Sequence, residues 1–412
     1  MYDGVGEVLA TGGLRSVFQP LVRLEDQQVI GFEALSRGPA GHPLESPIAL
    51  LDAARAAGRL GELDWACRAS AIRGAAGAGL DPSLSWFVNV EPESLTIPCP
   101  PQYRPDLAGA DQLRVVVELT ERALVHDPAE LFATVERVRS SGWGVALDDV
   151  GADPASLALL PFLDPDVVKL DMRLVSRHMD RDVAAVATAV RAHAEATGAT
   201  ILAEGIETER DVLVAQALGA SYGQGWFFGR PGPLPEHTDP VTALGLVAGR
   251  GRRDERTPFE LVSAVKTTAV THKRLLRPIS RHLEDQAISG GVPMVILGCF
   301  QHARFFTPRS ADRYARLAAS TAFTAAFGTE LAAEPAPGVR GALLNEGDRL
   351  VDEWNVLVVG PHYAGALVAR DLGDTGPDDE RRFEYVVTHD RALVLDAARS
   401  LFGSVAPRTP LR

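Results

Sequence analysis

Gly144-Val-Ala-Leu-Asp148-Asp149 is a short apolar run that ends in two adjacent carboxylates. Other short apolar runs in the first half of the chain end in the same way, at Glu118, Asp171 and Glu204. Runs of this length are typical of the buried strands of a parallel sheet. The carboxyl ends of such strands lie at one edge of the sheet, where α/β proteins place their chemistry. Clustered carboxylates repel one another, so the pattern predicts a bound cation.

Strand-like and helix-like segments alternate between Val17 and Arg230. Seven to eight strands with helices between them, in about 230 residues, fit one (β/α)8 barrel of the TIM type. The first two strands, 17–24 and 28–33, flank a turn and would form a hairpin that breaks the strict alternation. The strands expected after this hairpin are 86–90, 113–118, 145–147, 167–170, 200–203 and 223–228. We therefore predict an α/β domain at residues 1–235.

A second, smaller α/β unit is expected at residues 258–403, followed by a tail at 404–412. The connector at 236–257 follows Pro233 and Pro235, contains Pro240 and ends in an arginine-rich run, which indicates a solvated linker with a short helix inside it. The pattern predicts mostly helix over 259–288 and a helix over 311–327. It predicts strands at 294–300, 356–360, 364–369 and 383–387, and a closing helix at 390–401.

The bulk composition excludes several classes of protein. A net charge of −13 over 412 residues argues against a nucleic acid held by broad phosphate contacts, although a small phosphorylated ligand remains compatible with it. The distant cysteines Cys67, Cys99 and Cys299 indicate reduced thiols and no disulfide framework. We find no signal peptide and no apolar stretch of about 20 residues, so we expect a cytoplasmic protein without membrane insertion.

The strand-end residues have the chemistry that phosphodiester hydrolysis requires. The reaction needs a cation that neutralises the phosphate and acidifies a bound water. Mg²⁺ prefers carboxylate and amide oxygens. The strand-end oxygen donors are Glu33, Asn89, Glu118, Asp148 and Asp149. Lys169 could point into the same mouth and hydrogen-bond the attacking water.

Each of these residues also has a purely structural interpretation. Glu33 could be a surface carboxylate, and Asn89 could be a turn residue. The pair Asp148-Asp149 could form a turn or a helix N-cap. Lys169 could extend from a strand into solvent. All four interpretations would have to hold together, in this order along the chain, which favours the functional one.

Seven short motifs in order carry a family resemblance. They are Glu33-Ala-Leu with Arg37, Val88-Asn-Val90, Glu118-Leu-Thr-Glu121, Leu147-Asp-Asp149, Lys169-Leu-Asp171, Ala203-Glu-Gly-Ile-Glu-Thr208 and Gln224-Gly225. In this order they resemble the EAL family of cyclic-di-GMP phosphodiesterases. The resemblance implies a TIM-like barrel with one antiparallel strand, usually a homodimer. It implies hydrolysis of cyclic di-GMP to linear pGpG with Mg²⁺ or Mn²⁺.

The resemblance also implies roles for single residues. The ligands of the first metal would be Glu33, Asn89, Glu118 and Asp148. The second metal would be associated with Asp149, and the catalytic water would lie beside Lys169 and Glu204. Contacts to the cyclic dinucleotide would come from Gln19, Arg37 and Gln224. Support for the loop and pocket would come from Glu121 and Glu207.

The segment after the aspartate pair departs from the family. The family usually has Asp-Asp-Phe-Gly-Thr-Gly-Tyr-Ser-Ser, and this chain has Asp148-Asp-Val-Gly-Ala-Asp-Pro-Ala-Ser156. Pro154 stiffens this loop, and Asp153 could instead cap the helix that follows. Because a small misplacement costs orders of magnitude in rate, a receptor that binds cyclic di-GMP without turnover is the alternative. The complete set of carboxylates and Lys169 favours the enzyme, and a barrel used only for protein interaction would need no such set.

Residues 258–403 resemble the DICT sensory domain. The resemblance rests on 259–263, 354–361, 381–383 and 388–391, and it implies a regulatory role with an unknown signal or protein partner. The region 259–288 is the expected connector to the barrel. Two interpretations of the aromatic and basic residues stay open: Trp354 and Phe383 belong to the core, or a pocket is lined by Trp354, His362, Tyr363, Arg382 and His389.

Overall fold

The computed structural model describes residues 4–91, 94, 97–120, 128–152, 155–176, 179–246, 256–289 and 293–405. The chain divides into two compact units. The first consists of Met1–Ala123, Thr134–Ala152 and Asp164–Arg250, and the second of Leu124–Ala133, Asp153–Leu163 and Gly251–Arg412. Within the described residues, every helix is too short or too polar to cross a lipid bilayer.

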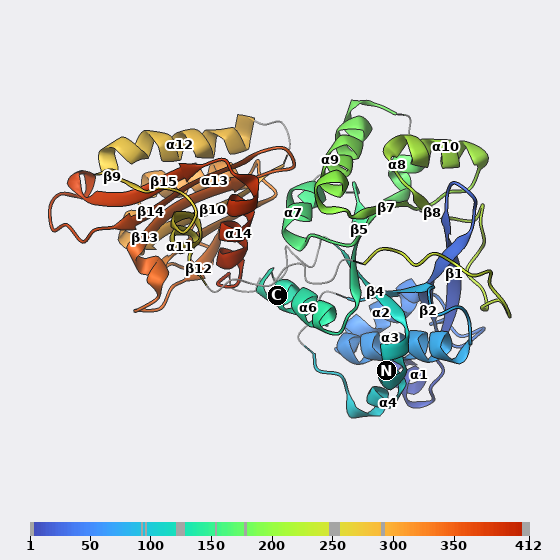
Figure 1. The fold of residues 1–412 in the computed structure, drawn as a ribbon. Helices are drawn as coiled ribbons and strands as arrows, with labels where there is room; N and C mark the ends of the chain where they lie inside the picture. Colours follow the sequence, from blue (N-terminus) through green and yellow to red (C-terminus); the bar gives the residue numbers. More distant parts are fainter. Residues whose placement is uncertain are drawn as a thin grey trace. The chain divides into compact units, whose positions relative to one another are not determined.

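The first unit contains a closed eight-stranded barrel (Figure 1). Strand β1 is antiparallel to both of its neighbours, β2 and β8, and every other pair of neighbouring strands is parallel. The strands are β1 (Arg15–Arg23), β2 (Val29–Arg37), β3 (Ser85–Asn89), β4 (Arg114–Thr120), β5 (Gly144–Val150), β6 (Val167–Leu170), β7 (Thr200–Ala203) and β8 (Tyr222–Gln224). This topology confirms the predicted TIM-like barrel with one antiparallel strand.

Helices alternate with these strands along the chain. They are α1 (Gly4–Ala10), α2 (Pro47–Ala56), α3 (Leu60–Gly77), α4 (Arg104–Leu107), α6 (Pro128–Ser140), α7 (Ala155–Leu163), α8 (Met172–Ser176), α9 (Arg181–Thr197) and α10 (Glu209–Leu218). Helix α10 begins at a capping box in which Thr208 and Asp211 satisfy each other's backbone N–H groups. Strand β8 ends at Gln224, earlier than predicted, because residues 225–228 form a tight turn closed by Phe228 N and Gly225 O at 3.1 Å.

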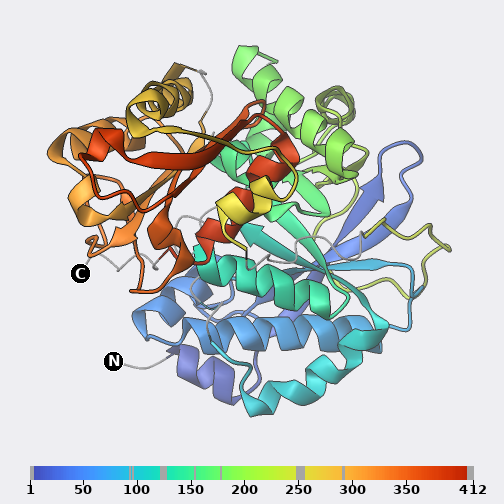
Figure 2. The same cartoon turned by 60° about the vertical axis from the view of Figure 1, so that its left-hand side comes forward.

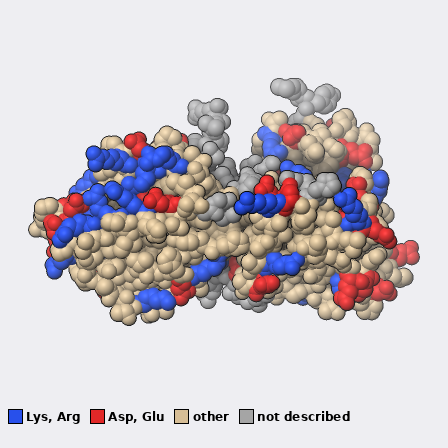
Figure 3. Space-filling model, turned by 90° about the horizontal axis from the view of Figure 1, so that it is seen from above, with Lys and Arg blue, Asp and Glu red and all other residues tan. Residues whose placement is uncertain are grey.

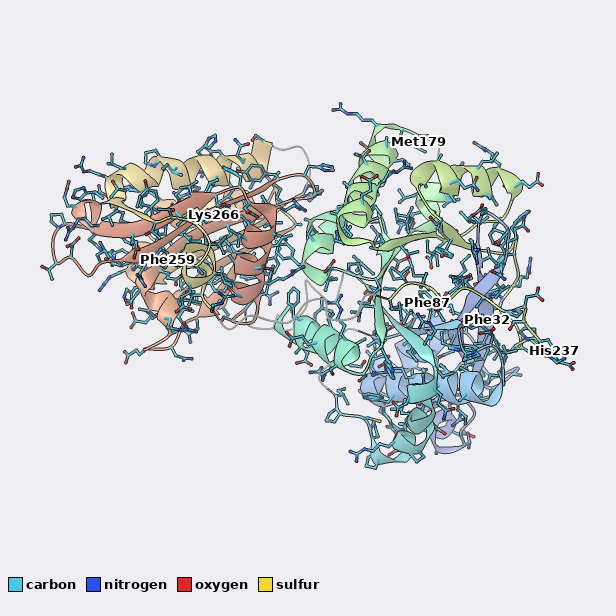
Figure 4. All side chains as sticks on the ribbon, in the orientation of Figure 1. Phe32, Phe87, Met179, His237, Phe259 and Lys266 are labelled. Atoms are coloured by element: carbon cyan, nitrogen blue, oxygen red, sulfur yellow. The ribbon has the colours of Figure 1, made fainter. Side chains whose placement is uncertain are left out.

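The barrel interior has an apolar layer below a polar layer. The side chains of residues two apart on a strand point to the same face. When one of them points into the barrel interior, the side chain two positions later points there as well. Phe87, labelled in Figure 4, is fully buried on β3, and Asn89 follows two residues later. The same spacing joins buried apolar residues to the polar residues at other strand ends, in the pairs Val116/Glu118, Ala146/Asp148, Val167/Lys169 and Leu202/Glu204.

The first part of the connector packs into the barrel. Leu244 is only 2% exposed and belongs to the apolar cluster that includes Phe87 and Val116. Its carbonyl accepts a hydrogen bond of 2.6 Å from Arg114. Residues 236–246 contain no helix, and residues 247–255 lie outside the described part of the chain. Leu244 therefore seals the end of the barrel opposite the polar layer.

The second unit is a seven-stranded sheet with helices on both faces. In sheet order the strands are β12 (Arg340–Leu343), β11 (Phe323–Thr329), β10 (Val295–His302), β13 (Glu353–Val359), β14 (Ala364–Asp371), β15 (Arg382–Thr388) and β9 (Ala269–His272). Helices α12 (Lys273–Ser289) and α13 (Pro308–Ala318) pack on one face through Leu276 and Tyr314. Helices α11 (Pro258–Ser263) and α14 (Arg391–Phe402) contact each other and also β13 and β14. Every residue of β13 is buried, as expected for a strand covered on both faces.

The prediction of mostly helix over 259–288 is confirmed, because α11 and α12 cover most of this range, whereas the predicted helix over 311–327 is wrong after Ala318. Strand β9 lies between α11 and α12 within 259–288, and 311–327 contains most of α13 followed by the first part of strand β11. Strand β9 is an edge strand with Val270 57% exposed, so it lacks an apolar alternation. Strand β11 is buried along its whole length, and periodicity does not distinguish such a run from a buried helix. Strand β12 was not predicted.

We predict that Leu244→Ala lowers the free energy of unfolding by about 2–4 kcal/mol, because the change leaves a cavity in a closed apolar cluster. Urea unfolding at fixed pH measures this change. Leu213→Ala is the matched control, because Leu213 is 67% exposed and its truncation should cost less than about 0.5 kcal/mol. Equal effects of the two variants would contradict the role of Leu244 as the seal of the barrel.

Candidate active site

The polar layer of the barrel is organised around the ammonium group of Lys169, which is completely buried. Its Nζ lies 2.7 Å from Glu204 Oε1, 3.1 Å from Asp148 Oδ1 and 3.9 Å from Glu33 Oε2. Glu118 also forms an ion pair with it. One cation therefore faces four carboxylates from β2, β4, β5 and the end of β7.

Glu33 connects this cluster to three amide side chains. Its Oε1 accepts a hydrogen bond of 2.9 Å from Asn89, and its Oε2 accepts one of 2.5 Å from Gln224. The same Gln224 amide donates to Gln19 Oε1 at 3.1 Å. The structure thus brings together Gln19, Glu33, Asn89 and Gln224, which are far apart in the sequence.

Backbone geometry explains how two consecutive aspartates serve one site. Neighbouring residues of a regular strand point to opposite faces. The register between β5 and β6 shifts between Leu147 and Val150, and Asp149 has a positive φ of 55°. This bulge brings carboxylate oxygens of Asp148, Asp149 and Glu204 within 4.8 Å of one another.

Burial and mutual repulsion shift the pKa values of these groups. Burial raises the pKa of Glu204 to about 8, with a further contribution from Asp148. Burial and Glu33 raise the pKa of Glu118 well above its usual value. Burial opposes ionisation of Glu33, but Lys169 and the bonds from Gln224 and Asn89 lower its pKa. Burial opposes the charge on Lys169 too, yet the carboxylates raise its pKa, so it stays protonated at neutral pH.

The donor set fits a hard divalent cation. Both carboxylate oxygens of Glu118 and Oδ1 of Asp148 are buried, and no described residue gives them a hydrogen bond of good geometry. All candidate ligands offer oxygen, from carboxylates or from the amide of Asn89, which suits Mg²⁺ or Mn²⁺ better than a soft metal. Asp148, Asp149 and Glu204 are a carboxylate group with ligand atoms close enough to share an ion.

Two cavities meet at Glu33. One, of about 320 Å³, is lined by Gln19, Glu33, Glu204 and Gln224 and has Trp226 at its rim. The other, of about 250 Å³, is lined by Glu33, Asn89 and Arg37. Sequence reasoning missed Trp226 and also Met172, both about half exposed beside the first cavity. The only sequence feature that could have identified them is their position, since Trp226 lies two residues after Gln224 and Met172 lies one residue after Asp171.

The structure describes two of the four remaining residues that were singled out from the sequence. Glu207 is exposed and lines the first cavity. Glu121 and Asp153 lie outside the described residues. Asp171, which had no predicted role, is 5% exposed and accepts hydrogen bonds from the backbone N (2.8 Å) and Nε (2.9 Å) of Arg173. Asp171 therefore holds the start of α8.

Glycine is required at Gly225 by a close backbone approach. A Cβ at this position would overlap the carbonyl of Ile206. Ile206 N donates to Gln224 O at 3.0 Å, and Phe227 N donates to Ile206 O at 3.0 Å. These bonds fasten the loop after Glu204 to the turn after Gln224, so the two sides of the mouth hold each other in place.

Family comparison agrees with this geometry. Residues 5–231, more than half of the chain, match the family described as EAL domain. The chain belongs to the EAL domain family. Residues 259–372 match the family described as sensory domain in diguanylate cyclases and two-component system, abbreviated DICT. Both resemblances expected from the motifs are confirmed.

Relatives of the EAL domain include signalling proteins and phosphodiesterases. An uncharacterized signaling protein of Caulobacter vibrioides is 31% identical over 234 residues, which are 55% of this chain and 28% of the relative. The probable cyclic di-GMP phosphodiesterase PdeB of Escherichia coli is 30% identical over 223 residues, 52% of this chain and 42% of PdeB. The chain thus matches less than half the length of each of these two relatives.

Solved structures with a similar domain include complexes with cyclic di-GMP. The PaMucR phosphodiesterase complex is 27% identical with a TM-score of 0.49, and the match covers 56% of this chain and 96% of that one. BlrP1 of Klebsiella pneumoniae, with calcium and the dinucleotide, is 29% identical with a TM-score of 0.47, and the match covers 53% and 56% of the two chains.

We predict that the metal-free protein becomes less stable as pH rises from about 5 to 8. A carboxylate whose pKa is raised on folding binds a proton that the unfolded chain has lost, so its stabilising effect disappears as pH rises through this window. Glu204→Gln should reduce the loss, by an amount on the order of 1–3 kcal/mol. Thermal unfolding in a chelator, measured at each pH, tests the difference.

The matched control for this experiment is Glu195→Gln, which neutralises an exposed carboxylate on α9. It should leave the pH profile of stability unchanged. Saturating Mg²⁺ should flatten the wild-type profile, because a divalent ion stabilises the ionised carboxylates. An identical pH slope in wild type and Glu204→Gln would show that Glu204 is not the group that titrates.

Proposed function

We propose that this EAL domain hydrolyses cyclic di-GMP to linear pGpG with Mg²⁺ or Mn²⁺, and that the DICT domain regulates it. The observation that carries the proposal is the cluster of four carboxylates around the buried Lys169. Membership of the EAL family and similarity to PdeB, a probable cyclic di-GMP phosphodiesterase, support the choice of substrate.

In this proposal the first ion is held by Glu33, Asn89, Glu118 and Asp148. The second ion is associated with Asp149. The ions would neutralise the phosphodiester and lower the pKa of a bound water. The substrate would be positioned by Gln19, Arg37 and Gln224, and the active-site loop and pocket would be supported by Glu121 and Glu207. The two cavities that meet at Glu33 offer space on both sides of the carboxylate cluster.

Charge states assign different tasks to Lys169 and Glu204. Because Lys169 stays protonated, it donates a hydrogen bond and stabilises negative charge but does not remove a proton. Glu204 Oε1 lies 2.7 Å from Lys169 Nζ, and its pKa of about 8 without metal means that it holds a proton at neutral pH; a bound cation would ionise it, and the carboxylate could then accept a proton. Lys169 would thus orient the water toward the phosphorus while Glu204 receives its proton.

We expect the full chain to convert cyclic di-GMP to pGpG in the presence of Mg²⁺ or Mn²⁺ and to lose this activity in a chelator. Glu33→Ala should lower kcat by about 10²–10³-fold or more, because it removes a metal ligand and the anchor of Asn89 and Gln224. Chromatographic separation of the two nucleotides measures the rate. Glu195→Ala, an exposed carboxylate on α9, should retain wild-type activity.

The receptor alternative predicts a different result in the same experiment. The altered segment after Asp149 is the feature that favours it, since Val150 stands where the family has an aromatic residue. Tight, metal-dependent binding of cyclic di-GMP without pGpG would exclude the enzyme and support the receptor. Absence of both binding and turnover would reject both functions.

Two further expectations stay predictions of the family resemblance. We propose a homodimer formed through the barrel, which light scattering of the full chain would test. We also propose that the signal or partner protein acts through the DICT domain. A chain that ends at residue 246, which retains the Leu244 seal, should hydrolyse cyclic di-GMP but no longer respond to that signal.

A further inference from the structure

The second unit contains a polar cavity of about 130 Å³. One face of α12 lines it through Lys273, Arg277, Ser280 and Arg281, residues whose helical spacing places them on one side. Thr307 and Ser310, at the amino end of α13, line the opposite wall. The volume corresponds to about four water molecules, enough for one phosphoryl group or a group of similar size.

Positive charge dominates this cavity. Its lining has four cations, Lys273, Arg277, Arg281 and Arg313, and two carboxylates, Glu284 and Asp378. Figure 3, which views the molecule from the side of α12, shows Lys and Arg side chains gathered on this unit. The cavity is therefore suited to an anion.

Several of these charges are already held in place by neighbours. Lys273 Nζ lies 2.7 Å from Asp378, and Arg313 Nε lies 2.6 Å from the buried Glu284. Arg277 pairs with Asp379 at 2.5 Å, outside the cavity lining. These pairs fix the positions of the cations without cancelling the excess of positive charge.

Two polar side chains in the cavity lack a partner. Among the described residues, no hydrogen bond or ion pair is made by the guanidinium of Arg281 or by the hydroxyl of Ser280, which is only 4% exposed. The Ser280 hydroxyl lines the cavity and is available to a ligand or a water molecule there. Arg281, by contrast, is exposed and can close over a ligand from the rim.

The opposite wall adds donors of a second kind. Helix α13 begins at Pro308 after its N-cap Thr307, which accepts a hydrogen bond from Ser310 N at 3.3 Å, so this wall offers the hydroxyls of Thr307 and Ser310 and the partial positive charge of a helix amino end. The floor is aromatic: Lys273 Nζ lies 4.4 Å from the ring centre of Phe305 and 5.6 Å from that of Trp354. Burial among these groups lowers the pKa of Lys273. A bound anion would counteract this effect, because it favours the charged form of the lysine.

We propose that this cavity is the ligand site of the DICT domain and that it binds the phosphoryl group of a small phosphorylated molecule. Arginine forks match the geometry of phosphate oxygens, and Arg277 and Arg281 stand one helical turn apart on the rim. Of the five residues predicted from the sequence to line a pocket in this unit, Trp354 alone lines this cavity. His362, Tyr363, Arg382 and His389 do not line it.

Titration of the full chain with inorganic phosphate, pyrophosphate and glycerol 3-phosphate, in a chelator that removes metal from the barrel, tests this site. Calorimetry should show saturable binding of at least one probe below about 10 mM. Arg281→Glu should weaken that binding about tenfold or more, because it replaces a free cation by an anion. Ser280→Ala should weaken it by a smaller factor.

Arg274→Glu is the matched control, because Arg274 lies on the same helix, is exposed, and pairs with Glu380 outside the cavity lining. It should change the affinity less than about twofold. Both arginines are exposed, so far-UV circular dichroism should show intact folds for both variants. Equal affinity of wild type and Arg281→Glu, or no saturable binding of any probe, would overturn the proposal. These outcomes do not depend on hydrolysis in the barrel.

Discussion

One buried ammonium group holds the polar half of the barrel together. Two like charges 4 Å apart repel by about 4 kcal/mol at an effective dielectric constant of 20. The mutual repulsion of the four carboxylates around Lys169 is therefore offset only in part by this one cation. Protonation of Glu204 and Glu118 relieves part of the repulsion in the absence of metal, which explains the raised pKa values of both groups. A divalent ion would supply the missing positive charge and allow all four to ionise.

Barrel closure gives this cluster its geometry. The strands that carry the site residues also carry, two positions earlier, the apolar residues of the layer below. A change in the packing of Phe87 or Val116 therefore moves Asn89 or Glu118 as well. Stability and function share the same strands, and the tight apolar layer keeps the carboxylates close despite their repulsion. The connector takes part in this arrangement through Leu244.

The second unit uses charge in the opposite sense. The barrel collects carboxylates around one lysine, whereas the cavity between α12 and α13 collects four cations around two carboxylates. The two proposed sites in this acidic chain, which has a net charge of −13, are therefore one for a cation and one for an anion. Net charge alone would not have indicated the second site, since its basic residues are spread over α12 and α13 and are neutralised in the total.

The amino-acid sequence by itself determined the barrel, its antiparallel first strand and most of its site. Apolar runs that end in carboxylates are a local pattern that can be read from the sequence. The alternation of strands and helices makes the strands parallel, so the carboxylates at their ends lie at the same edge of the barrel. Only the tertiary structure decided that Lys169 is completely buried among Glu33, Glu118, Asp148 and Glu204, because these contacts join five strands. It also decided that Asp149 turns toward its neighbour, since a bulge and a positive φ leave no periodic signal. In the second unit, β9 and β11 escaped prediction because an exposed edge strand and a fully buried one both lack the alternation that sequence reasoning detects.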